Sequence, residues 1–160
     1  MKEITKNIKL VITDVDGVLT DGHVYITDAG EQMRSFYVRD GLAMKALMKH
    51  GYKVGIITAA LTAGAVETRA KMLGIDLLYI GLEEKVKIVD QWRKELKLKW
   101  ENIAYIGDDL IDMDVMKKAG FSACPADAVD KVKKIATVTL KTKGGWGCFR
   151  EMTERFFEVL

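Results

Sequence analysis

Residues 8–17 read IKLVITDVDG, an apolar and β-branched run that leads directly into two carboxylates and a glycine. Such a run is typical of a strand that is buried on both faces of a parallel sheet. Asp14 and Asp16 are two residues apart, so in extended backbone their side chains project to the same side. Gly17 then allows the chain to turn away sharply. The stretch predicts a strand with an acidic loop at its carboxyl end.

Four further apolar runs predict strands at residues 53–57, 77–80, 103–106 and 136–140. Helical spacing of apolar residues marks the segments between them, and glycine closes three of these segments, where a left-handed residue can end a helix. Strands that alternate with helices predict an α/β fold, a doubly wound parallel sheet with right-handed crossovers. The residues that mark the helices are Leu42, Ala46 and Leu47 before Gly51; Val66, Ala70 and Leu73 before Gly74; Ile88, Val89, Trp92 and Leu96; and Val115, Met116 and Ala119 before Gly120.

Residues 22–38 break this alternation. Two alternating runs, residues 22–26 and 33–38, flank a turn segment that contains Asp28 and Gly30, which predicts a β-hairpin. Because the hairpin follows the acidic loop, we expect a flap over a site, with a peripheral edge hairpin as the alternative. Nothing in the composition marks a linker, so we expect one domain over residues 1–160 with this insertion.

The composition excludes several classes of function. The chain has 25 basic and 23 acidic residues, and the lysines are mixed with acids rather than gathered in a basic stripe, so we expect no nucleic-acid partner. No apolar run approaches the roughly 20 residues that cross a bilayer, and the first residues lack the features of a signal peptide. We therefore expect no membrane partner and a cytoplasmic location. The two cysteines have no spacing that suggests a zinc site or a disulfide framework.

A second acidic segment follows the predicted strand at 103–106 and reads GDDLID at residues 107–112. Ligands of α/β sheets bind beyond the carboxyl ends of the strands. If the two strands are neighbours, Asp108 or Asp109 lies close to Asp14. Magnesium prefers hard oxygen ligands and is usually held by a few carboxylates together with substrate phosphate. The two segments together predict a Mg²⁺ site.

Taken together, these motifs resemble those of the haloacid dehalogenase superfamily of phosphatases. In that family a DxD motif ends the first strand, Ser or Thr ends the second, and Lys precedes an acidic pair. Asp14 and Asp16, then Thr58, Lys85 and Asp108 stand at these stations in the same order. The resemblance implies a magnesium-dependent phosphatase that works through an aspartyl-phosphate intermediate.

The resemblance also implies a role for each residue. Asp14 would be the nucleophile and Asp16 the general acid and base. Asp14, the backbone carbonyl of Asp16 and Asp108 would hold the metal. Thr58 and Lys85 would hold the oxygens of the transferring phosphoryl group.

Two further carboxylates, Asp109 and Asp112, are expected to orient Lys85 or the water molecules on the metal. Each assignment has a plainer alternative when the residue is taken alone. Thr58 could cap a helix, Lys85 could be a solvated helix lysine, and Asp112 could face solvent in the first turn of its helix.

Within the superfamily, the chain resembles most closely the small subfamily typified by 3-deoxy-D-manno-octulosonate 8-phosphate phosphatase, which has no inserted cap domain. The marks are residues 14–22 with the hairpin, RDG at 39–41, GDDLIDM at 107–113 and GGWGCFRE at 144–151. The resemblance implies a homotetramer in which hairpins assemble and a neighbouring subunit helps to cover each active site. It also implies a sugar-acid phosphate of eight or nine carbons as substrate.

The segment after Thr58 departs from the family pattern. Members usually have glycine and a charged residue there, whereas residues 59–64 read AALTAG, without charge and with one extra residue. Arg39 or Arg69 is therefore a candidate ligand of a sugar carboxylate, with a surface ion pair as an equal alternative. Two other functions stay open at this point: a phosphatase of another small metabolite, and a catalytically silent oligomerisation domain.

Overall fold

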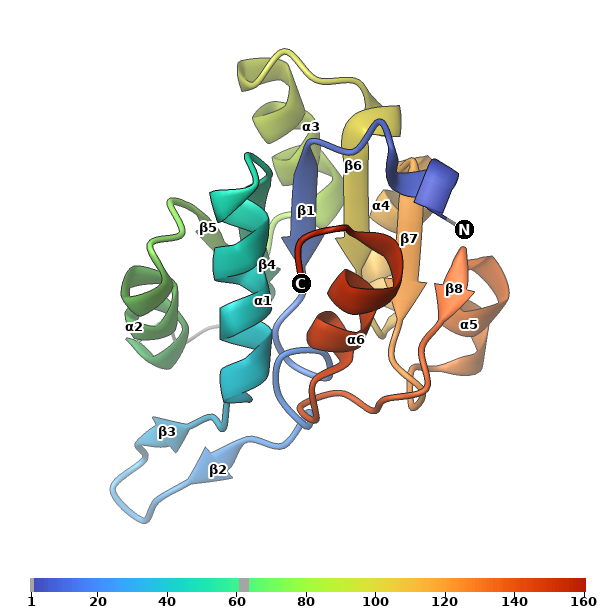
Figure 1. Cartoon of the computed structure of the whole chain (residues 1–160). Coiled ribbons are helices and arrows are strands. Elements are labelled where there is room, and N and C mark those ends of the chain that lie inside the picture. The colour runs from blue at the N-terminus through green and yellow to red at the C-terminus, as the bar shows by residue number, and fades with distance from the viewer. Residues whose placement is uncertain (1, 61–63) are drawn as a thin grey trace.

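A computed structural model describes residues 2–60 and 64–160 (Figure 1). Six strands form its central sheet: Leu10–Thr13 (β1), Lys53–Thr58 (β4), Leu77–Ile80 (β5), Ile103–Ile106 (β6), Phe121–Cys124 (β7) and Val138–Thr139 (β8). Their order is β5-β4-β1-β6-β7-β8, and all neighbours are parallel. The predicted α/β fold with a parallel sheet is confirmed. β1 lies beside β6, so the two acidic segments that follow these strands are neighbours.

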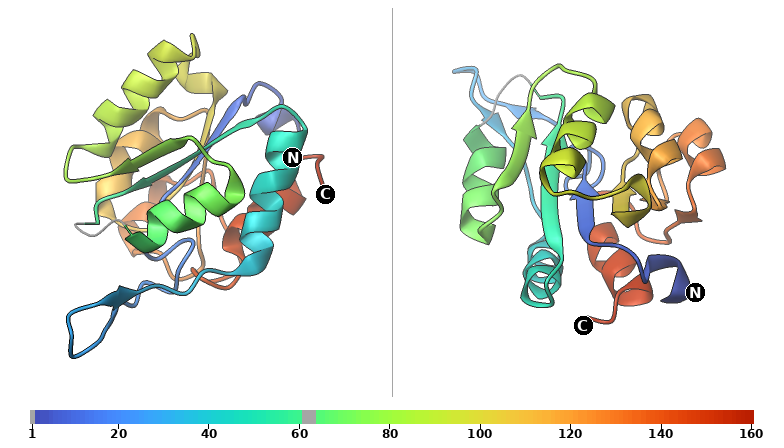
Figure 2. Two further views of the ribbon diagram at one scale, coloured as in Figure 1. Left: turned by 90° about the vertical axis from the view of Figure 1, so that its left-hand side faces the viewer. Right: turned by 90° about the horizontal axis from the view of Figure 1, so that it is seen from above.

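Helices cover both faces of this sheet (Figure 2). They are Val38–Lys49 (α1), Gly64–Leu73 (α2), Lys85–Glu95 (α3), Met113–Lys118 (α4), Asp130–Ile135 (α5) and Cys148–Phe156 (α6), with short 3-10 turns at Lys2–Thr5 (η1), Trp100–Asn102 (η2) and Leu110–Asp112 (η3). Because side chains of a strand alternate between faces, Val11 packs in the core beneath α1, α2 and α6, whereas Leu10 and Ile12 pack in the core beneath α3, α4 and α5. No helix in the described part of the chain is long and apolar enough to span a membrane.

Two of the three predicted glycine stops are confirmed. Gly51 and Gly74 follow α1 and α2 with φ of +86° and +74°. Residues that carry a Cβ adopt this left-handed conformation only at an energetic cost. Gly120 differs, because it does not have a positive φ. A Cβ at Gly120 would collide with the backbone carbonyl of Glu101, so close packing rather than helix termination requires glycine there.

Other predicted details were wrong or incomplete. Leu42 is exposed, because α1 turns the face with Ala43, Met44 and Leu47 toward the sheet. The predicted strand at 136–140 shrinks to Val138–Thr139, since α5 continues to Ile135. Helix α6 was not predicted, although its buried Phe149, Met152 and Phe156 recur at helical spacing.

The predicted hairpin is present but shorter than expected. Strands Tyr25–Ile26 (β2) and Gln32–Met33 (β3) pair antiparallel and project from the body of the molecule (Figure 1). A two-stranded ribbon with exposed side chains buries little apolar surface, which limits the length of its pairing. Its role as a flap stays a prediction.

Candidate active site

The sheet brings the predicted site residues to one edge. β1 lies between β4 and β6, with Thr13 in register with Ile56 on one side and Ile106 on the other. The loops that follow these strands therefore meet. They line an open hollow of about 290 Å³, formed by Asp14, Asp16, Gly17, Gly22, Thr58, Ala59, Ala60, Asp108, Asp109 and Ile111.

The acidic loop after β1 is a compact turn. The carbonyl oxygen of Val15 accepts hydrogen bonds from the N–H groups of Val18, Leu19 and Thr20 at 3.2, 2.9 and 3.1 Å. Gly17 has φ of +86°, and a Cβ at this position would collide with the carboxylate of Asp108. Glycine therefore provides both the backbone conformation and the close approach of this loop to Asp108.

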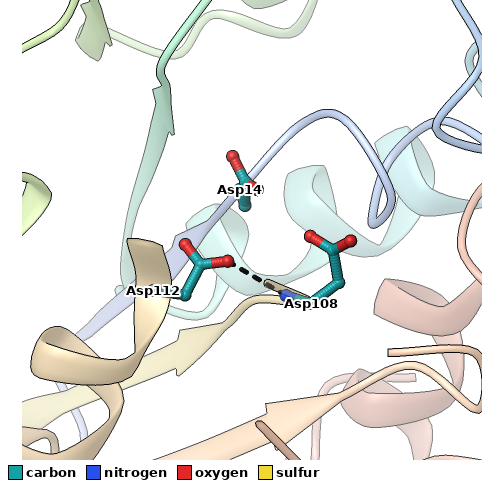
Figure 3. Close-up of side chains that lie close together, drawn as sticks. All are labelled: Asp14, Asp108 and Asp112. Carbon is teal, nitrogen blue, oxygen red and sulfur yellow. Dashed lines mark hydrogen bonds between the residues drawn. The ribbon is translucent and has the colours of Figure 1, made fainter. Parts of the chain in front are cut away.

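Three carboxylates converge beneath this loop (Figure 3). Asp14, Asp108 and Asp112 each offer an oxygen within 4.8 Å of the others. Asp14 and Asp112 are buried, so Asp112 does not face solvent. Its Oδ2 accepts hydrogen bonds from the backbone N–H groups of Asp108 at 3.0 Å and Asp109 at 3.2 Å, which fixes the β6–η3 loop.

Lys85, the first residue of α3, supplies the cation of this cluster. Its Nζ lies 2.7 Å from Oδ1 of Asp14 and 2.7 Å from Oδ1 of Asp112, and only 3% of its side chain is exposed. Asp112 Oδ1 also accepts a hydrogen bond of 2.5 Å from the hydroxyl of Tyr105. Asp112 thus contacts Lys85 directly, and its role in orienting this lysine stays a prediction.

Tyr105 was missed by the sequence reasoning. It occupies a buried position in β6, where the pattern indicated only an apolar strand. A tyrosine in such a run is itself a signal, because a buried phenol hydroxyl needs a hydrogen-bond partner. The nearby Asp112 meets that need.

Burial and mutual repulsion raise the proton affinity of these carboxylates. Burial raises the pKa of Asp14 well above its usual value, and the charge of Asp112 adds to this, while Lys85 opposes it. Burial, with the charges of Asp112 and Asp109, raises the pKa of Asp108 to about 7. Burial lowers the pKa of Lys85, but the adjacent Asp14 and Asp112 outweigh it, so the net shift is upward. The cluster thus holds more negative charge than one lysine balances.

This charge excess fits a divalent cation. Oδ1 of Asp108 is buried and has no hydrogen-bond partner among the residues described, so it is free to be a ligand. Both oxygens of Asp112 are already engaged. The donor set consists of oxygens alone, which suits Mg²⁺.

Magnesium affinity is expected to fall as the pH drops below about 7. A ligating carboxylate must be deprotonated, and Asp108 with its pKa of about 7 binds a proton in competition with the metal below that value. One competing proton weakens apparent affinity by about tenfold per pH unit well below the pKa. Calorimetric titration with Mg²⁺ on either side of neutrality measures this, and equal affinities would contradict it.

Of the remaining predicted site residues, Thr58 and Asp109 line the hollow, whereas Arg39 and Arg69 are not among the residues that form it. Thr58 is buried at the end of β4 and lines the hollow. It does not cap a helix, because residues 59 and 60, which follow it, are not helical. Asp109 also lines the hollow but is exposed, and its Oδ1 accepts a hydrogen bond from the N–H of Leu110 at 2.7 Å, which caps η3.

The two candidate ligands of a sugar carboxylate lie outside this hollow. Arg39 is exposed, with its guanidinium 6.0 Å from the ring centroid of Tyr37. Arg69 is half-buried, 5.9 Å from the ring centroid of Phe36. Their roles stay predictions. Of the segment that departs from the family pattern, Ala59 and Ala60 line the hollow, whereas residues 61–63 lie outside the described residues.

The glycine-rich turn at residues 144–147 braces the acidic loop from the same chain. The N–H of Gly145 donates to the carbonyl of Val18 at 2.9 Å, and Sγ of Cys148 donates to the same oxygen at 3.2 Å. A Cβ at Gly144 would collide with the carbonyl of Gly17. Glycine is thus required where the two loops touch.

Comparison with known proteins defines the class first. A family model described as haloacid dehalogenase-like hydrolase matches residues 78–147, which include Lys85 and the second acidic segment. The parallel sheet flanked by helices agrees with this class of enzyme.

Individual relatives define the family within the class. The 3-deoxy-D-manno-octulosonate 8-phosphate phosphatase KdsC of Haemophilus influenzae is 39% identical over 159 residues, 99% of this chain and 88% of that protein. Its counterpart from Escherichia coli K12 is 40% identical over 93% of this chain and 79% of its own. The chain therefore belongs to the family of the 3-deoxy-D-manno-octulosonate 8-phosphate phosphatases.

Solved structures support the same family assignment. The phosphatase of that name from Yersinia pestis has a TM-score of 0.92 and 39% identity, covering 95% of this chain and 82% of its own. The enzyme from Moraxella catarrhalis, solved with a magnesium ion, a phosphate ion and KDO, has a TM-score of 0.92 and 35% identity, covering 96% and 87%.

Proposed function

We propose that the protein is a magnesium-dependent phosphatase that hydrolyses 3-deoxy-D-manno-octulosonate 8-phosphate (KDO 8-phosphate) to KDO and inorganic phosphate. One observation carries the proposal: Asp14, Asp108 and Asp112 gather around Lys85 at the carboxyl edge of the sheet. The chain that carries this arrangement covers 88% and 79% of two relatives that are named for this activity.

The first half-reaction transfers the phosphoryl group to the protein. A carboxylate oxygen of Asp14 attacks phosphorus, and the bond from phosphorus to the sugar oxygen breaks. Asp16 gives its proton to the departing alkoxide. Asp14, Asp108 and the backbone carbonyl of Asp16 would hold magnesium, which would supply positive charge that offsets the repulsion between the nucleophile and the phosphate.

The second half-reaction returns the protein to its starting state. Asp16, now a carboxylate, takes a proton from water as the water oxygen attacks phosphorus. The bond from phosphorus to Asp14 breaks and inorganic phosphate leaves.

Lys85 and Thr58 are suited to hold the transferring oxygens. The ammonium of Lys85 has three donors, of which two point to Asp14 and Asp112, so one is left for a phosphoryl oxygen. Thr58 lines the same hollow. Donors that are fixed before the reaction stabilise charge in the transition state without reorganisation.

Steady-state kinetics with Mg²⁺ tests the choice of substrate. KDO 8-phosphate, nine-carbon sugar-acid 9-phosphates and p-nitrophenyl phosphate are compared as substrates. The proposal expects the highest kcat/KM for KDO 8-phosphate. A clear preference for a nine-carbon substrate would assign the protein to a neighbouring specificity, and turnover of the aryl phosphate alone would contradict the sugar-acid assignment.

We also propose that the chain forms a homotetramer through its hairpin. The hairpin exposes the apolar side chains of Val24, Ile26 and Met33, and Ile26 is 67% exposed. Apolar side chains that gather on a projecting element are typical of an interaction surface. The open hollow needs a cover to exclude water, and a neighbouring subunit would provide it.

Charged substitutions on the hairpin are expected to dissociate this assembly. Ile26→Asp with Met33→Lys should reduce the mass measured by sedimentation and lower turnover of the sugar phosphate more than turnover of p-nitrophenyl phosphate. Ile4→Asp, at an exposed position in η1, is the matched control and should change neither. A wild-type monomer with full activity on the sugar phosphate would contradict the proposal.

A further inference from the structure

The carboxylate of Asp16 is held by one arginine. Nε of Arg34 donates to Oδ1 of Asp16 at 2.8 Å, and Nη2 donates to Oδ2 at 3.2 Å. The side chain of Arg34 is 5% exposed and that of Asp16 is 32% exposed. Two parallel hydrogen bonds from a planar guanidinium fix the position and the plane of a carboxylate.

This arginine comes from an element that is otherwise exposed. Arg34 directly follows β3, and its neighbours Met33 and Ser35 are exposed. In extended backbone alternate side chains point to opposite sides, so the hairpin turns the buried Arg34 toward the acidic loop, whereas Met33 and Ser35 on either side of it face outward. Its guanidinium reaches the residue that the proposed function requires to transfer a proton twice in each cycle.

We propose that Arg34 is a positioning residue that fixes the carboxylate of Asp16 for proton transfer. The inference rests on the proposed function, in which Asp16 is the general acid and base. A carboxylate on a loop can rotate about its side-chain torsions, and a displacement of about 1 Å can cost about 10²-fold in rate. A forked pair of hydrogen bonds removes that freedom.

The competing explanation is that Arg34 only anchors the hairpin. A second contact allows the two to be separated, because the hydroxyl of Tyr25 donates to Oδ2 of Asp21 at 3.2 Å. This bond also joins the hairpin to the acidic loop, but it does not touch Asp16. Tyr25→Phe is therefore the matched control.

The experiment compares two leaving groups. An alkoxide needs a proton to depart, whereas p-nitrophenolate does not. Arg34→Gln is expected to lower kcat for KDO 8-phosphate by about 10²-fold, with KM little changed, and to lower kcat for p-nitrophenyl phosphate by less than about tenfold. Arg34→Lys keeps the positive charge but cannot form the two parallel hydrogen bonds. Its kcat for KDO 8-phosphate should therefore lie between the values of wild type and Arg34→Gln. Tyr25→Phe should leave both substrates unaffected.

A double-mutant cycle with Asp16→Asn completes the test. If Arg34 acts through Asp16, Arg34→Gln should add no further loss in the Asp16→Asn background. The inference would be overturned if Arg34→Gln lowered kcat equally for both substrates, or if it lowered kcat further in the Asp16→Asn background. If Arg34→Gln does not fold, as judged by its thermal melt, Arg34→Lys carries the same comparison. Wild-type protein without magnesium-dependent turnover would overturn the proposed function itself, whereas active protein that tolerates Arg34→Gln would overturn this inference alone.

Discussion

Asp14→Asn is expected to abolish phosphate release while it leaves the fold intact. The amide is nearly isosteric with the carboxylate but cannot form the acyl phosphate, so the covalent route is closed. Removal of a covalent nucleophile commonly costs on the order of 10⁴–10⁶-fold in kcat. Phosphate release from KDO 8-phosphate with saturating Mg²⁺ measures the loss.

The same variant is expected to be more stable than wild type in the absence of metal at alkaline pH. Because the pKa of Asp14 is raised in the folded state, the folded protein binds this proton more tightly than the unfolded chain does. Stability is therefore lost as the pH rises from the unfolded pKa toward the folded one. Asparagine removes the buried charge that causes this loss, so the gain in melting temperature should grow with pH.

An exposed aspartate provides the control for both effects. Asp114→Asn, with a side chain that is 76% exposed, should change neither turnover nor melting temperature. Substantial turnover by Asp14→Asn would remove Asp14 from the role of nucleophile. Loss of activity together with a lower melting temperature would instead indicate a structural role for its carboxylate.

Lys85→Met is expected to inactivate the enzyme and to destabilise it strongly. Methionine has a similar length, but it leaves Asp14 and Asp112 buried beside each other without their shared cation. Removal of one partner from a buried ion pair typically costs about 3–5 kcal/mol. Urea unfolding without metal measures the change in the free energy of unfolding.

Lys87→Met is the matched control on the same helix. Lys87 pairs with Glu84 at 3.4 Å, but its side chain is 61% exposed, so its substitution should cost less than about 1 kcal/mol. In the double variant Lys85→Met with Asp14→Asn, one of the two unpaired carboxylates is gone, and stability should recover in part. Equal costs at Lys85 and Lys87 would contradict the central role given to Lys85.

Local signals in the sequence were sufficient for the fold and for the members of the acidic site. The run at residues 8–13 is apolar except for Lys9 and Thr13, as expected of a strand between two layers of helices, and residues 10–13 form the central strand β1. Asp14, Thr58 and Asp108 each follow or end such a run, so parallel topology alone was enough to place them at one edge. Lys85 depended on the resemblance, because a lysine at the start of a helix is usually solvated.

Contacts between distant segments could not be predicted in the same way. The pairing of Arg34 with Asp16 depends on how the hairpin folds back, and nothing in the alternation of residues 33–38 indicates it. The close approach of Gly144 to Gly17 joins segments at opposite ends of the chain. Leu42 was one of the residues that marked the first helix, yet it is exposed, because single apolar residues on a helix do not define which face packs against the sheet.

The covalent role of Asp14 is tested most directly by the stereochemistry at phosphorus. A phosphorothioate analogue of KDO 8-phosphate, labelled with oxygen isotopes in known configuration, is hydrolysed in isotopically labelled water, and the configuration of the product thiophosphate is determined. Each in-line displacement inverts phosphorus, so transfer to Asp14 followed by attack of water predicts net retention. Net inversion would mean that water attacks the substrate directly, and it would contradict the phosphorylation of Asp14.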